Sequence, residues 1–382
     1  MGNKMRVLFL SQGSEISDHP GFHDGFLRLQ KEGVVTEYLN VPYFGFARKN
    51  GWDAFYQEVV RLSAQREFDV VYFQFFHQKG KPSPRGCIES LRRLPRPPVV
   101  IASAGDPFAD SWMRPDYPED FKEASRLADI TFSTQMGRAA DKMIAWGARN
   151  VVLAPNALCQ VRFKAESVDL EKHKFDFDVV FVGNNNHTRL PNPGSKYWWA
   201  GKKRQRLVKA LAKRFGSRFG LFGKGWDYPH AQGPVPFDKQ QEVFRRGKVV
   251  VGANPYSYSD YYSSNRIFME IASGIPTVEL YTPRFEKVLR NGDHCYFASD
   301  VEEVVERCEY LLKEDVDGIY SKAAQAAKYI TEKHTQYHRL KFELDTVQKF
   351  IQNSRHVDIS FPFFLPEVNL VEESKFAVRE RL

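Results

Sequence analysis

Residues 263–276 read Ser-Ser-Asn-Arg-Ile-Phe-Met-Glu-Ile-Ala-Ser-Gly-Ile-Pro, and this stretch contains the signals for both ends of a short helix. Ser263 or Ser264 can cap its start, because a serine hydroxyl accepts a hydrogen bond from a backbone N–H two or three residues further on. Gly274 supplies the left-handed residue that commonly follows a helix, and Pro276 cannot continue one. Apolar residues recur on one side of the turn, so the pattern predicts a helix with one buried face.

The charges in the first turn of this helix indicate a ligand. A helix start favours negative charge, yet Asn265 and Arg266 stand there and no acid follows the cap. That arrangement suits an anion from outside, such as a phosphate bound by the arginine and by free N–H groups near Ser264. Glu270 lies four residues after Arg266 on the same side, where a carboxylate can accept hydrogen bonds from the two hydroxyls of a ribose. The stretch therefore predicts a site for a nucleotide diphosphate.

The rest of the chain alternates strand-like and helix-like segments twice. One series starts at the apolar run Arg6–Leu10 and the other at Asp178–Val182. Such alternation predicts a doubly wound parallel sheet in each half. A polar run at 163–175 separates the halves, so we expect an α/β protein with one domain at 1–165 and a second at 176–334.

Composition is consistent with two ordinary domains. The chain has 382 residues, of which 42% are hydrophobic, enough for two cores. Its four cysteines are scattered without a CxxC spacing, which favours free thiols in a reducing compartment and argues against a zinc site. The start of the chain lacks the apolar core of a signal peptide, and no segment approaches the roughly 18 apolar residues of a membrane span. These features predict a cytoplasmic protein.

Glycines follow the strands predicted in the second half, at Gly183, 223–225 and Gly252. In open α/β sheets, ligands bind beyond the carboxyl ends of the strands. Gly183 and Asn184 open a polar loop whose backbone could approach a phosphate, and Lys224 could reach the same phosphate from the neighbouring turn. A surface loop of turn-forming residues is the structural alternative for Asn184.

An aromatic loop follows the strand that ends near residue 253. It holds four tyrosines between Tyr256 and Tyr262. Tyrosine rings can stack on a nucleobase or line a sugar pocket, so both named residues are candidates for donor binding, and core packing is the alternative.

The second half of the chain resembles a known family. The resemblance is carried by Asn265, Arg266, Phe268, Glu270, Ala272 and Gly274, then by Val278-Glu279-Leu280 and Asn291-Gly292-Asp293. This pattern is similar to the donor-binding half of group-1 glycosyltransferases with the GT-B fold, and most similar to their spore-maturation (CgeB-like) branch.

That resemblance implies two Rossmann-like domains that face each other across a cleft, the acceptor-side domain at 1–165 and the nucleotide-sugar-binding domain at 176–334. We also expect a last helix at 335–352 that returns to the N-terminal domain, so that residues 335–382 pack on that domain. It implies that Glu270 binds the ribose of a nucleotide-diphosphate sugar, of UDP or GDP type, and that the reaction retains the anomeric configuration. Retaining members carry a second Glu eight positions earlier, where this chain has Tyr262. No DxD-like carboxylate pair stands at a strand end, so we expect no metal and no cofactor.

Candidates for acid–base chemistry lie at predicted strand ends of the first half. The loop after the first strand contains His19, His23 and Asp24, and Asp106 follows a later strand. A histidine there could deprotonate an acceptor hydroxyl, as an inverting enzyme requires. Satisfied surface or capping residues are the alternative for each of these. His77 is a weaker candidate of the same kind.

The cationic stretch Lys202–Arg218 predicts a helix over Lys202–Phe215 with one cationic face, within a chain of formal net charge +8. This face could contact the anionic inner face of a membrane, although a solvated face is the alternative. No nucleic-acid-binding motif is present. We therefore expect a glycosyltransferase that acts on a glycan or lipid-linked acceptor. A sugar-nucleotide epimerase or hydrolase, and a non-catalytic sugar-nucleotide-binding protein of polysaccharide assembly, are the alternatives.

Overall fold

The computed structural model describes residues 4–76, 81–106, 117–185, 194–313, 315–353 and 362–365. The first sheet in this part of the chain has six parallel strands in the order β2-β1-β3-β4-β5-β6. Its strands are β1 (Met5–Leu10), β2 (Val35–Asn40), β3 (Val70–Phe73), β4 (Val99–Ala104), β5 (Ile130–Ser133) and β6 (Val151–Leu153). Its helices are α1 (Pro20–Lys31), α2 (Tyr43–Asn50), α3 (Trp52–Arg66), α4 (Arg85–Arg92), α5 (Glu119–Leu127) and α6 (Arg138–Ala145).

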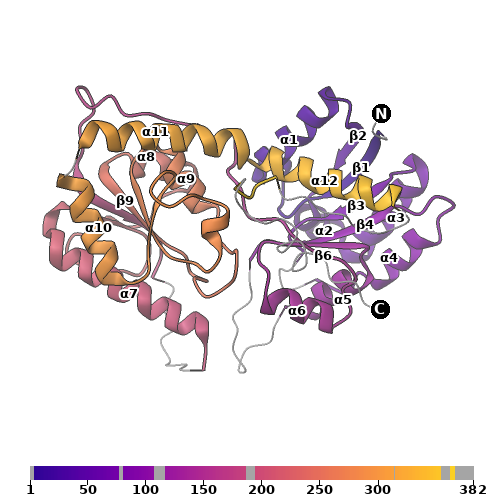
Figure 1. The fold of residues 1–382 in the computed structure, drawn as a ribbon. Helices are drawn as coiled ribbons and strands as arrows, with labels where there is room; N and C mark the ends of the chain where they lie inside the picture. The colour runs from indigo at the N-terminus through magenta and orange to yellow at the C-terminus, as the bar shows by residue number, and fades with distance from the viewer. Residues whose placement is uncertain are drawn as a thin grey trace.

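The second sheet has five parallel strands in the order β11-β10-β9-β7-β8. Its strands are β7 (Phe177–Val182), β8 (Phe219–Phe222), β9 (Gly247–Ala253), β10 (Thr277–Leu280) and β11 (Tyr296–Ala298). Its helices are α7 (Lys196–Phe215), α8 (Gln240–Phe244), α9 (Arg266–Ala272), α10 (Val301–Lys313) and α11 (Val316–Lys333). Figure 1 shows the two α/β units side by side.

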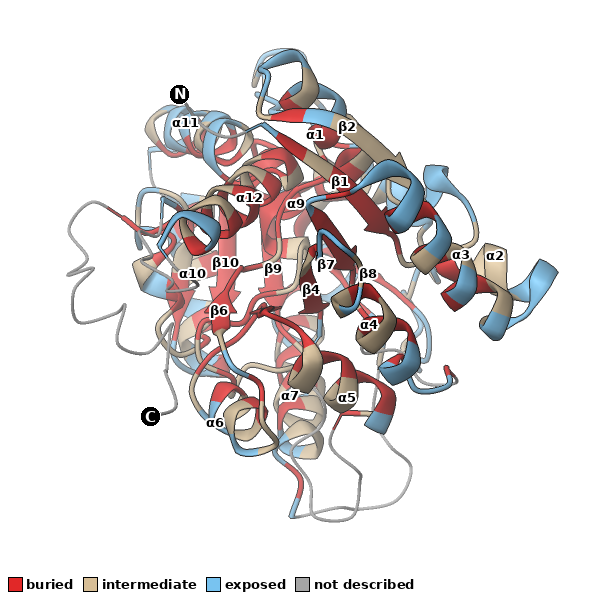
Figure 2. Ribbon diagram, turned by 90° about the vertical axis from the view of Figure 1, so that its right-hand side faces the viewer, coloured by how far each residue is buried: buried red, intermediate tan, exposed pale blue. Residues whose placement is uncertain are grey.

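Most of the strands are apolar because helices cover both faces of each sheet. All four residues of β3, Val-Val-Tyr-Phe, are buried, and Val249–Val251 of β9 are buried as well. Figure 2 shows most strands of the two sheets as buried, with the edge strand β2 only partly so, whereas the covering helices expose their outer sides. The predicted fold class, two parallel-sheet α/β domains, is confirmed.

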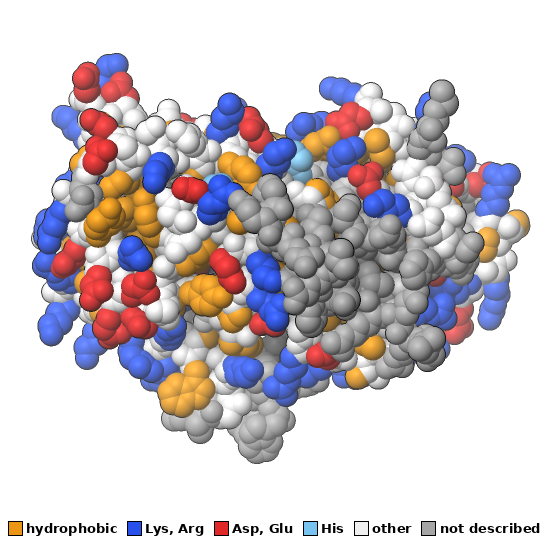
Figure 3. Space-filling view, in the orientation of Figure 1, with side chains coloured by type: hydrophobic (Ala, Val, Ile, Leu, Met, Phe, Trp, Pro, Cys, Tyr) orange, Lys and Arg blue, Asp and Glu red, His pale blue; other side chains and the backbone are white. Residues whose placement is uncertain are grey.

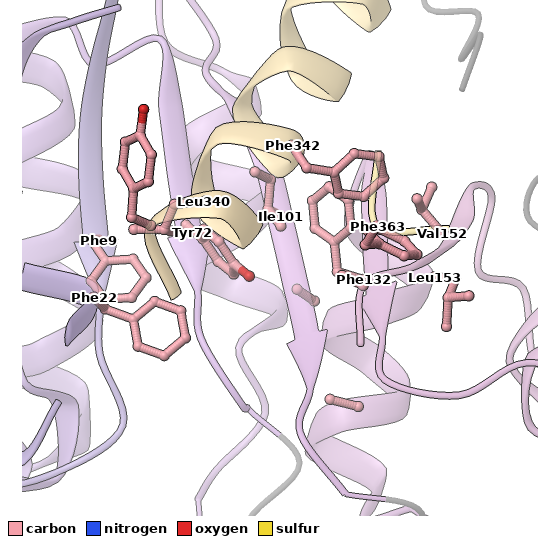
Figure 4. Packing of buried hydrophobic residues seen from close by; sticks show 14 of the residues in the cluster. Phe9, Phe22, Tyr72, Ile101, Phe132, Val152, Leu153, Leu340, Phe342 and Phe363 are labelled. Carbon is pink, nitrogen blue, oxygen red and sulfur yellow. The ribbon is translucent and has the colours of Figure 1, made fainter. Parts of the chain in front are cut away.

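The last helix, α12 (Gln336–Gln352), returns to the first sheet, as expected. Tyr337 Oη donates a hydrogen bond of 2.6 Å to Glu32, next to the end of α1. Leu340 and Phe342 of this helix pack with Phe9, Tyr72 and Phe132 of the first sheet, together with Phe363 from the C-terminal part of the chain (Figure 4). The chain turns from α11 into α12 at Thr335, which pairs with His338 in a capping box.

The basic helix, predicted over Lys202–Phe215 within the cationic stretch Lys202–Arg218, starts earlier than predicted and ends where predicted. It begins at Lys196 because the Ser195 side chain accepts a hydrogen bond from Trp198 N. It ends at Phe215, since Gly216 has φ +54° and the next residues form a 3₁₀ turn. No helix in the described residues is long and apolar enough to cross a membrane.

Candidate functional site

Helix α9 begins without the predicted serine cap. Asn265 occupies the N-cap position, its side chain makes no capping bond, and the Ser263 hydroxyl donates to Ser264 O instead. The serine cap was therefore wrong, because that hydroxyl bonds within its own turn. The end of the helix was predicted correctly, since Gly274 has φ +72° directly after the C-cap residue.

Two carboxyl groups lie side by side in the second domain. Glu270 of α9 and Glu279 of β10 are 1% and 5% exposed. Both carboxyl groups pack over Gly252 of β9. A Cβ atom added to this glycine would lie only 2.6 Å from Glu270 Oε2 and 1.6 Å from Glu279 Oε2, so a larger residue would not fit. Neither oxygen of Glu270 receives a hydrogen bond from the described residues, nor does Glu279 Oε2. Such orphaned acceptors indicate a missing proton or ligand.

Two guanidinium groups face this carboxyl pair. Arg204 of α7 is buried and donates to Asn184 O (3.2 Å) and Ala253 O (2.5 Å), at the ends of β7 and β9. Arg266 extends over the end of β7. Its Nη1 lies 3.5 Å from the point where a Cβ atom added to Gly183 would lie. The Nε atoms of both arginines are buried without a partner among the described residues. The carboxyl ends of β7 and β9 thus hold four ionisable side chains together.

Burial dominates the electrostatics of this cluster. It raises the pKa of Glu270, against the opposing charges of Arg266 and Arg204. Burial, and then the charge of Glu270, raise the pKa of Glu279 well above its usual value. Burial also lowers the pKa of Arg204 to about 10, so that this group remains a cation at neutral pH. Burial therefore favours the protonated form of this carboxyl pair, and the cluster is suited to bind an anion and hydroxyl groups.

Asp106, at the end of β4, reaches the second domain through Tyr262. The Tyr262 hydroxyl donates to Asp106 Oδ1 at 2.8 Å, and the ring of Tyr256 lies edge-on to that of Tyr262. Burial raises the pKa of Asp106, and the hydrogen bond from Tyr262 opposes this shift. Tyr262 is fully buried and Tyr256 is half-buried, so the aromatic loop packs against the site rather than projecting from it.

Two adjoining cavities lie between the sheets. A cavity of about 300 Å³ is lined by residues of the first domain, by Phe237 and Asn265 of the second and by α12, and a smaller one of about 190 Å³ has Asp106 and Ser264 in its lining. Four residues line both: His19, Phe75, Asn156 and Asn265. Asn156 Nδ2 donates both to Gly105 O (3.3 Å) and to Ser263 O (2.9 Å), which ties the two walls together.

His19 therefore lies where the two cavities meet. It is half-buried, and this burial lowers the pKa of its imidazole, which also makes a hydrogen bond with the backbone of Gln12. A histidine that stays neutral at pH 7 can accept a proton from a hydroxyl group. Glu270, by contrast, lies one turn deeper along α9 and lines neither cavity.

Comparison with known proteins agrees with this geometry. Residues 203–345 match a family described as glycosyl transferase-like, and the matched segment contains both arginines and both carboxyl groups. An α-glucosyltransferase solved with UDP and a 13-mer DNA is 14% identical, with 91% of this chain and 100% of that chain covered and a TM-score of 0.59. HepE of Anabaena, solved with UDP and glucose, is 13% identical, with 90% and 100% covered and a TM-score of 0.53.

This chain has the GT-B fold. A putative UDP-N-acetylglucosamine 2-epimerase of Listeria monocytogenes is also similar, at 11% identity, with 94% of this chain and 100% of that chain covered and a TM-score of 0.51. No curated protein matches the sequence.

The remaining predicted residues lie at different places in the GT-B fold. His23 Nδ1 lies 3.3 Å from Tyr38 Oη, and Asp24 accepts a hydrogen bond from Gln160 Nε2 at 3.0 Å. Neither residue lines the two cavities, because helix α1 starts at Pro20 and directs both toward neighbouring elements. Of His19, His23 and Asp24, the structure brings only His19 to the cleft, where Asp18 of the same loop also lines the larger cavity.

Gly183 and Asn184 are both held by hydrogen bonds from the turn after β8. Gly183 is buried and its carbonyl accepts a hydrogen bond from Trp226 Nε1 at 2.6 Å. The Asn184 side chain accepts from Lys224 N at 2.9 Å, and the Lys224 side chain is exposed beside it. His77 lies outside the described residues.

Sequence reasoning missed Arg204 and Glu279 as members of the cluster. A signal was present for each. Arg204 stands three and seven residues before Leu207 and Leu211, on the apolar face of its helix, and Glu279 interrupts an apolar strand. A lone charge at a buried position must be paired or functional. No group of three or more potential metal ligands occurs in the described residues.

The exposed face of α7 carries an uncompensated row of cations. Trp199, Lys202, Arg206, Lys209 and Lys213 follow one another at intervals of three and four residues, which places them on one side of the helix. Arg206, Lys209 and Lys213 are exposed and have no carboxylate partner within the described ranges, and Trp199 is 49% exposed. Blue side chains follow the lower left edge in Figure 3, where Figure 1 places α7.

Proposed function

We propose that this protein is a glycosyltransferase that moves a sugar from a nucleotide-diphosphate sugar to a hydroxyl acceptor. The observation that carries the proposal is the buried cluster of Arg204, Arg266, Glu270 and Glu279 at the ends of β7 and β9, within the glycosyl transferase-like segment. In doubly wound sheets this edge is where nucleotides bind. The closer resemblance to the spore-maturation branch is part of the same proposal and rests on the residues from Asn265 onward.

The donor would bind through this cluster. Arg266, with the N–H groups near Ser264 and Asn265, would hold the diphosphate and stabilise it as it leaves, and Lys224 would add charge from the β8 turn. Glu270 would accept hydrogen bonds from the ribose hydroxyls, and Tyr256 and Tyr262 would form the adjacent wall. Neighbours of this fold were solved with UDP, which favours a UDP-sugar over the GDP alternative. Two guanidinium groups supply the positive charge that a metal ion often provides, so we propose a metal-independent reaction.

The acceptor would occupy the cavity of about 300 Å³ on the other side of His19. Aromatic faces from Phe22, Phe75 and Phe237 and polar groups from Asn156 and Gln336 line it, a combination that suits the apolar and hydroxylated faces of a sugar ring. We propose a glycan or lipid-linked saccharide as acceptor. His19 would accept the proton of the attacking hydroxyl, and Asp106 would position the reacting groups from its bond to Tyr262.

The stereochemical outcome rests on the resemblance, which favours retention. The position of His19 in the cleft would equally serve an inverting mechanism, and Tyr262 replaces the second glutamate of retaining relatives. Proton NMR of the freshly formed glycoside distinguishes the two outcomes through its anomeric coupling.

The decisive experiment is a thermal-shift panel of UDP, GDP, ADP, CMP and dTDP, with magnesium and with EDTA, on the wild type and Glu270→Ala. We expect one diphosphate to raise the unfolding midpoint, equally with and without metal, and Glu270→Ala to lose this shift. Glu306→Ala is the matched control, because Glu306 is an exposed carboxylate on α10 whereas the carboxyl groups of the cluster are buried. If no nucleotide raises the unfolding midpoint of the wild type, the proposal is refuted.

Turnover separates the alternatives. With a radiolabelled UDP-sugar, a transferase releases UDP only in step with glycoside formation on an added saccharide. An epimerase or hydrolase, which the Listeria neighbour makes a specific competitor, converts the UDP-sugar without any acceptor. A non-catalytic binding protein releases nothing. A DNA duplex belongs in the acceptor panel as a contrasting substrate, because one neighbour was solved with DNA.

A further inference from the structure

Glu279 is a buried acid that the functions proposed above leave without a role. It stands in β10 among Thr277, Val278 and Leu280, which are all buried. Its carboxyl group accepts a hydrogen bond from the backbone N–H of Asn254, just past the end of β9, while its Oε2 atom has no donor among the described residues. An ionised carboxylate in such a place is costly to bury, so its presence calls for a partner.

The partner is Glu270. Both carboxyl groups lie against the same bare backbone of Gly252, and they are within hydrogen-bond reach of each other. Two ionised carboxylates are both acceptors and repel each other, so they can join only through a proton that one of them keeps. Two like acids at contact distance then titrate as one unit.

Among the described residues, the charged and titratable groups around the pair are consistent with this protonation. Arg204 faces it from α7 and Arg266 from the start of α9, and both attract negative charge to the pair. Cys295, just before β11, is fully buried, and its thiol stays neutral because burial and the two carboxyl groups raise its pKa. One shared proton leaves two guanidinium charges against one carboxylate charge, so the cluster is electropositive.

We propose that Glu279 is a positioning residue of the donor site, which shares a proton with Glu270, directs the Glu270 carboxyl toward the ribose hydroxyls and leaves one guanidinium charge uncompensated for the diphosphate. This inference rests on the proposed function for the identity of the ligand, but not for the shared proton. The Asn254 N–H fixes Glu279 from the side of β9, and Glu279 in turn fixes Glu270.

A shared proton makes donor binding depend on pH. The bound diphosphate is an anion next to the carboxyl pair, so it strengthens the hold of the pair on its proton. The complex then contains at least as many protons as the free protein, and affinity must fall as pH rises and the free pair loses its proton. A full proton taken up on binding corresponds to about tenfold in affinity per pH unit.

The test uses calorimetric titration of UDP-glucose, and of GDP-glucose, between pH 6 and 8.5 in two buffers of different ionisation enthalpy. A nucleotide sugar has no titrating phosphate in this range, so any proton uptake belongs to the protein. We expect the affinity of the wild type to fall about fivefold or more across the range, with measurable proton uptake. Glu279→Gln, which mimics the protonated acid, should bind well and lose the pH dependence.

Glu279→Ala separates positioning from mere stability. It removes the group that fixes Glu270, so we expect a raised donor KM with a smaller change in kcat, and recovery of KM in Glu279→Gln. The control Glu306→Ala should behave as the wild type throughout. Parallel pH profiles in the wild type and Glu279→Gln would overturn the inference while leaving the transferase intact.

A measurement without ligand keeps the two proposals distinguishable. The unfolding midpoint of the wild type should fall more steeply from pH 6 to pH 9 than that of Glu279→Gln. The folded wild type holds the shared proton in this range and the unfolded chain does not, so rising pH favours unfolding, whereas Glu279→Gln has no such proton to lose. Equal slopes would refute the shared proton. If neither nucleotide sugar binds while the slopes differ, the proposed function and the donor role of Glu279 both fail, and the shared proton alone stands.

Discussion

Gly223 is the position where a single methyl group should disturb the donor site most. It follows β8, has φ +136° and is held by a hydrogen bond from its own N–H to Gly233 O at 2.7 Å. An ideal Cβ there would lie 2.2 Å from Gly183 O and 2.6 Å from Gly183 C, where ordinary contacts begin at 3.4 Å. These are backbone atoms at the end of β7, so they cannot swing aside as the end of a side chain could.

The cost of Gly223→Ala has two parts. Overpacking of a fitted site costs about 1–3 kcal/mol. A backbone conformation that is nearly exclusive to glycine costs about another 1–3 kcal/mol. We expect Gly223→Ala to lower the free energy of unfolding by about 4 kcal/mol, and to weaken nucleotide binding because Gly183 lies under Arg266.

Two other glycines of the same region separate these parts. Gly216 has φ +54° and ψ −125°, also a conformation nearly exclusive to glycine, but no atom lies within 4 Å of its Cβ position, so Gly216→Ala carries the backbone cost alone, about 1–3 kcal/mol. Gly201 lies within α7 with open space around it, so Gly201→Ala should stabilise by about 0.5–1 kcal/mol.

Urea denaturation followed by circular dichroism measures all three variants, and the comparison is valid where the slope m is unchanged. A Gly223→Ala protein that loses no more stability than Gly216→Ala would refute the reasoning, because it would mean that β7 and β8 can separate at no cost.

Three further predictions follow from the described contacts. His19→Asn should lower the transfer rate about 100-fold at saturating donor without weakening nucleotide binding. His23→Asn should change the rate little, because the His23 ring pairs with Tyr38 outside the cleft. Initial rates measure the transfer rate of each variant, and calorimetry measures its nucleotide binding. Burial raises the pKa of Glu343 from 4.5 to about 8, so the folded protein binds more protons than the unfolded chain in this window, and the free energy of unfolding should fall from pH 4.5 to 8. Glu343→Gln should flatten that slope in denaturation at pH 5 and pH 8, and an unchanged slope would show that other groups cause it. If the cationic row of α7 contacts a membrane, the protein should sediment with vesicles that contain phosphatidylglycerol and not with vesicles of pure phosphatidylcholine. Each of Arg206→Gln, Lys209→Gln and Lys213→Gln should then weaken this binding by about 1 kcal/mol. Equal sedimentation with both kinds of vesicle would show that the row is a solvated face.

Much of the fold could be predicted because its signals are local. The bounds of β5 and β8 follow directly from short apolar runs that start and stop abruptly, and the end of α9 follows from one glycine and one proline. Errors occurred where a single contact fixes a boundary. Helix α7 starts six residues before its predicted start because of one cap at Ser195, and the serine cap of α9 failed because its hydroxyl bonds elsewhere.

The candidate site divides in the same way. Arg266 and Glu270 could be paired from their spacing on one helix, since residues four apart lie on the same face. Arg204 and Glu279 could not be assigned to them, because their approach depends on the order of the strands. Strand β9 lies between β7 and β10, and this order alone places Gly252 beneath both carboxyl groups.

The sequence by itself determined two parallel-sheet domains, the helix that faces the predicted ligand and the strand ends around it. All of these are periodic or terminal signals within some ten to twenty residues, which short-range sterics and hydrogen bonding enforce. Only the tertiary structure decided that Tyr262 bonds to Asp106, 156 residues away, that His19 and not His23 reaches the cleft, and that Glu279 pairs with Glu270. Those contacts arise when separate elements pack, and the burial that makes them chemically important exists only after the sheets have closed around them.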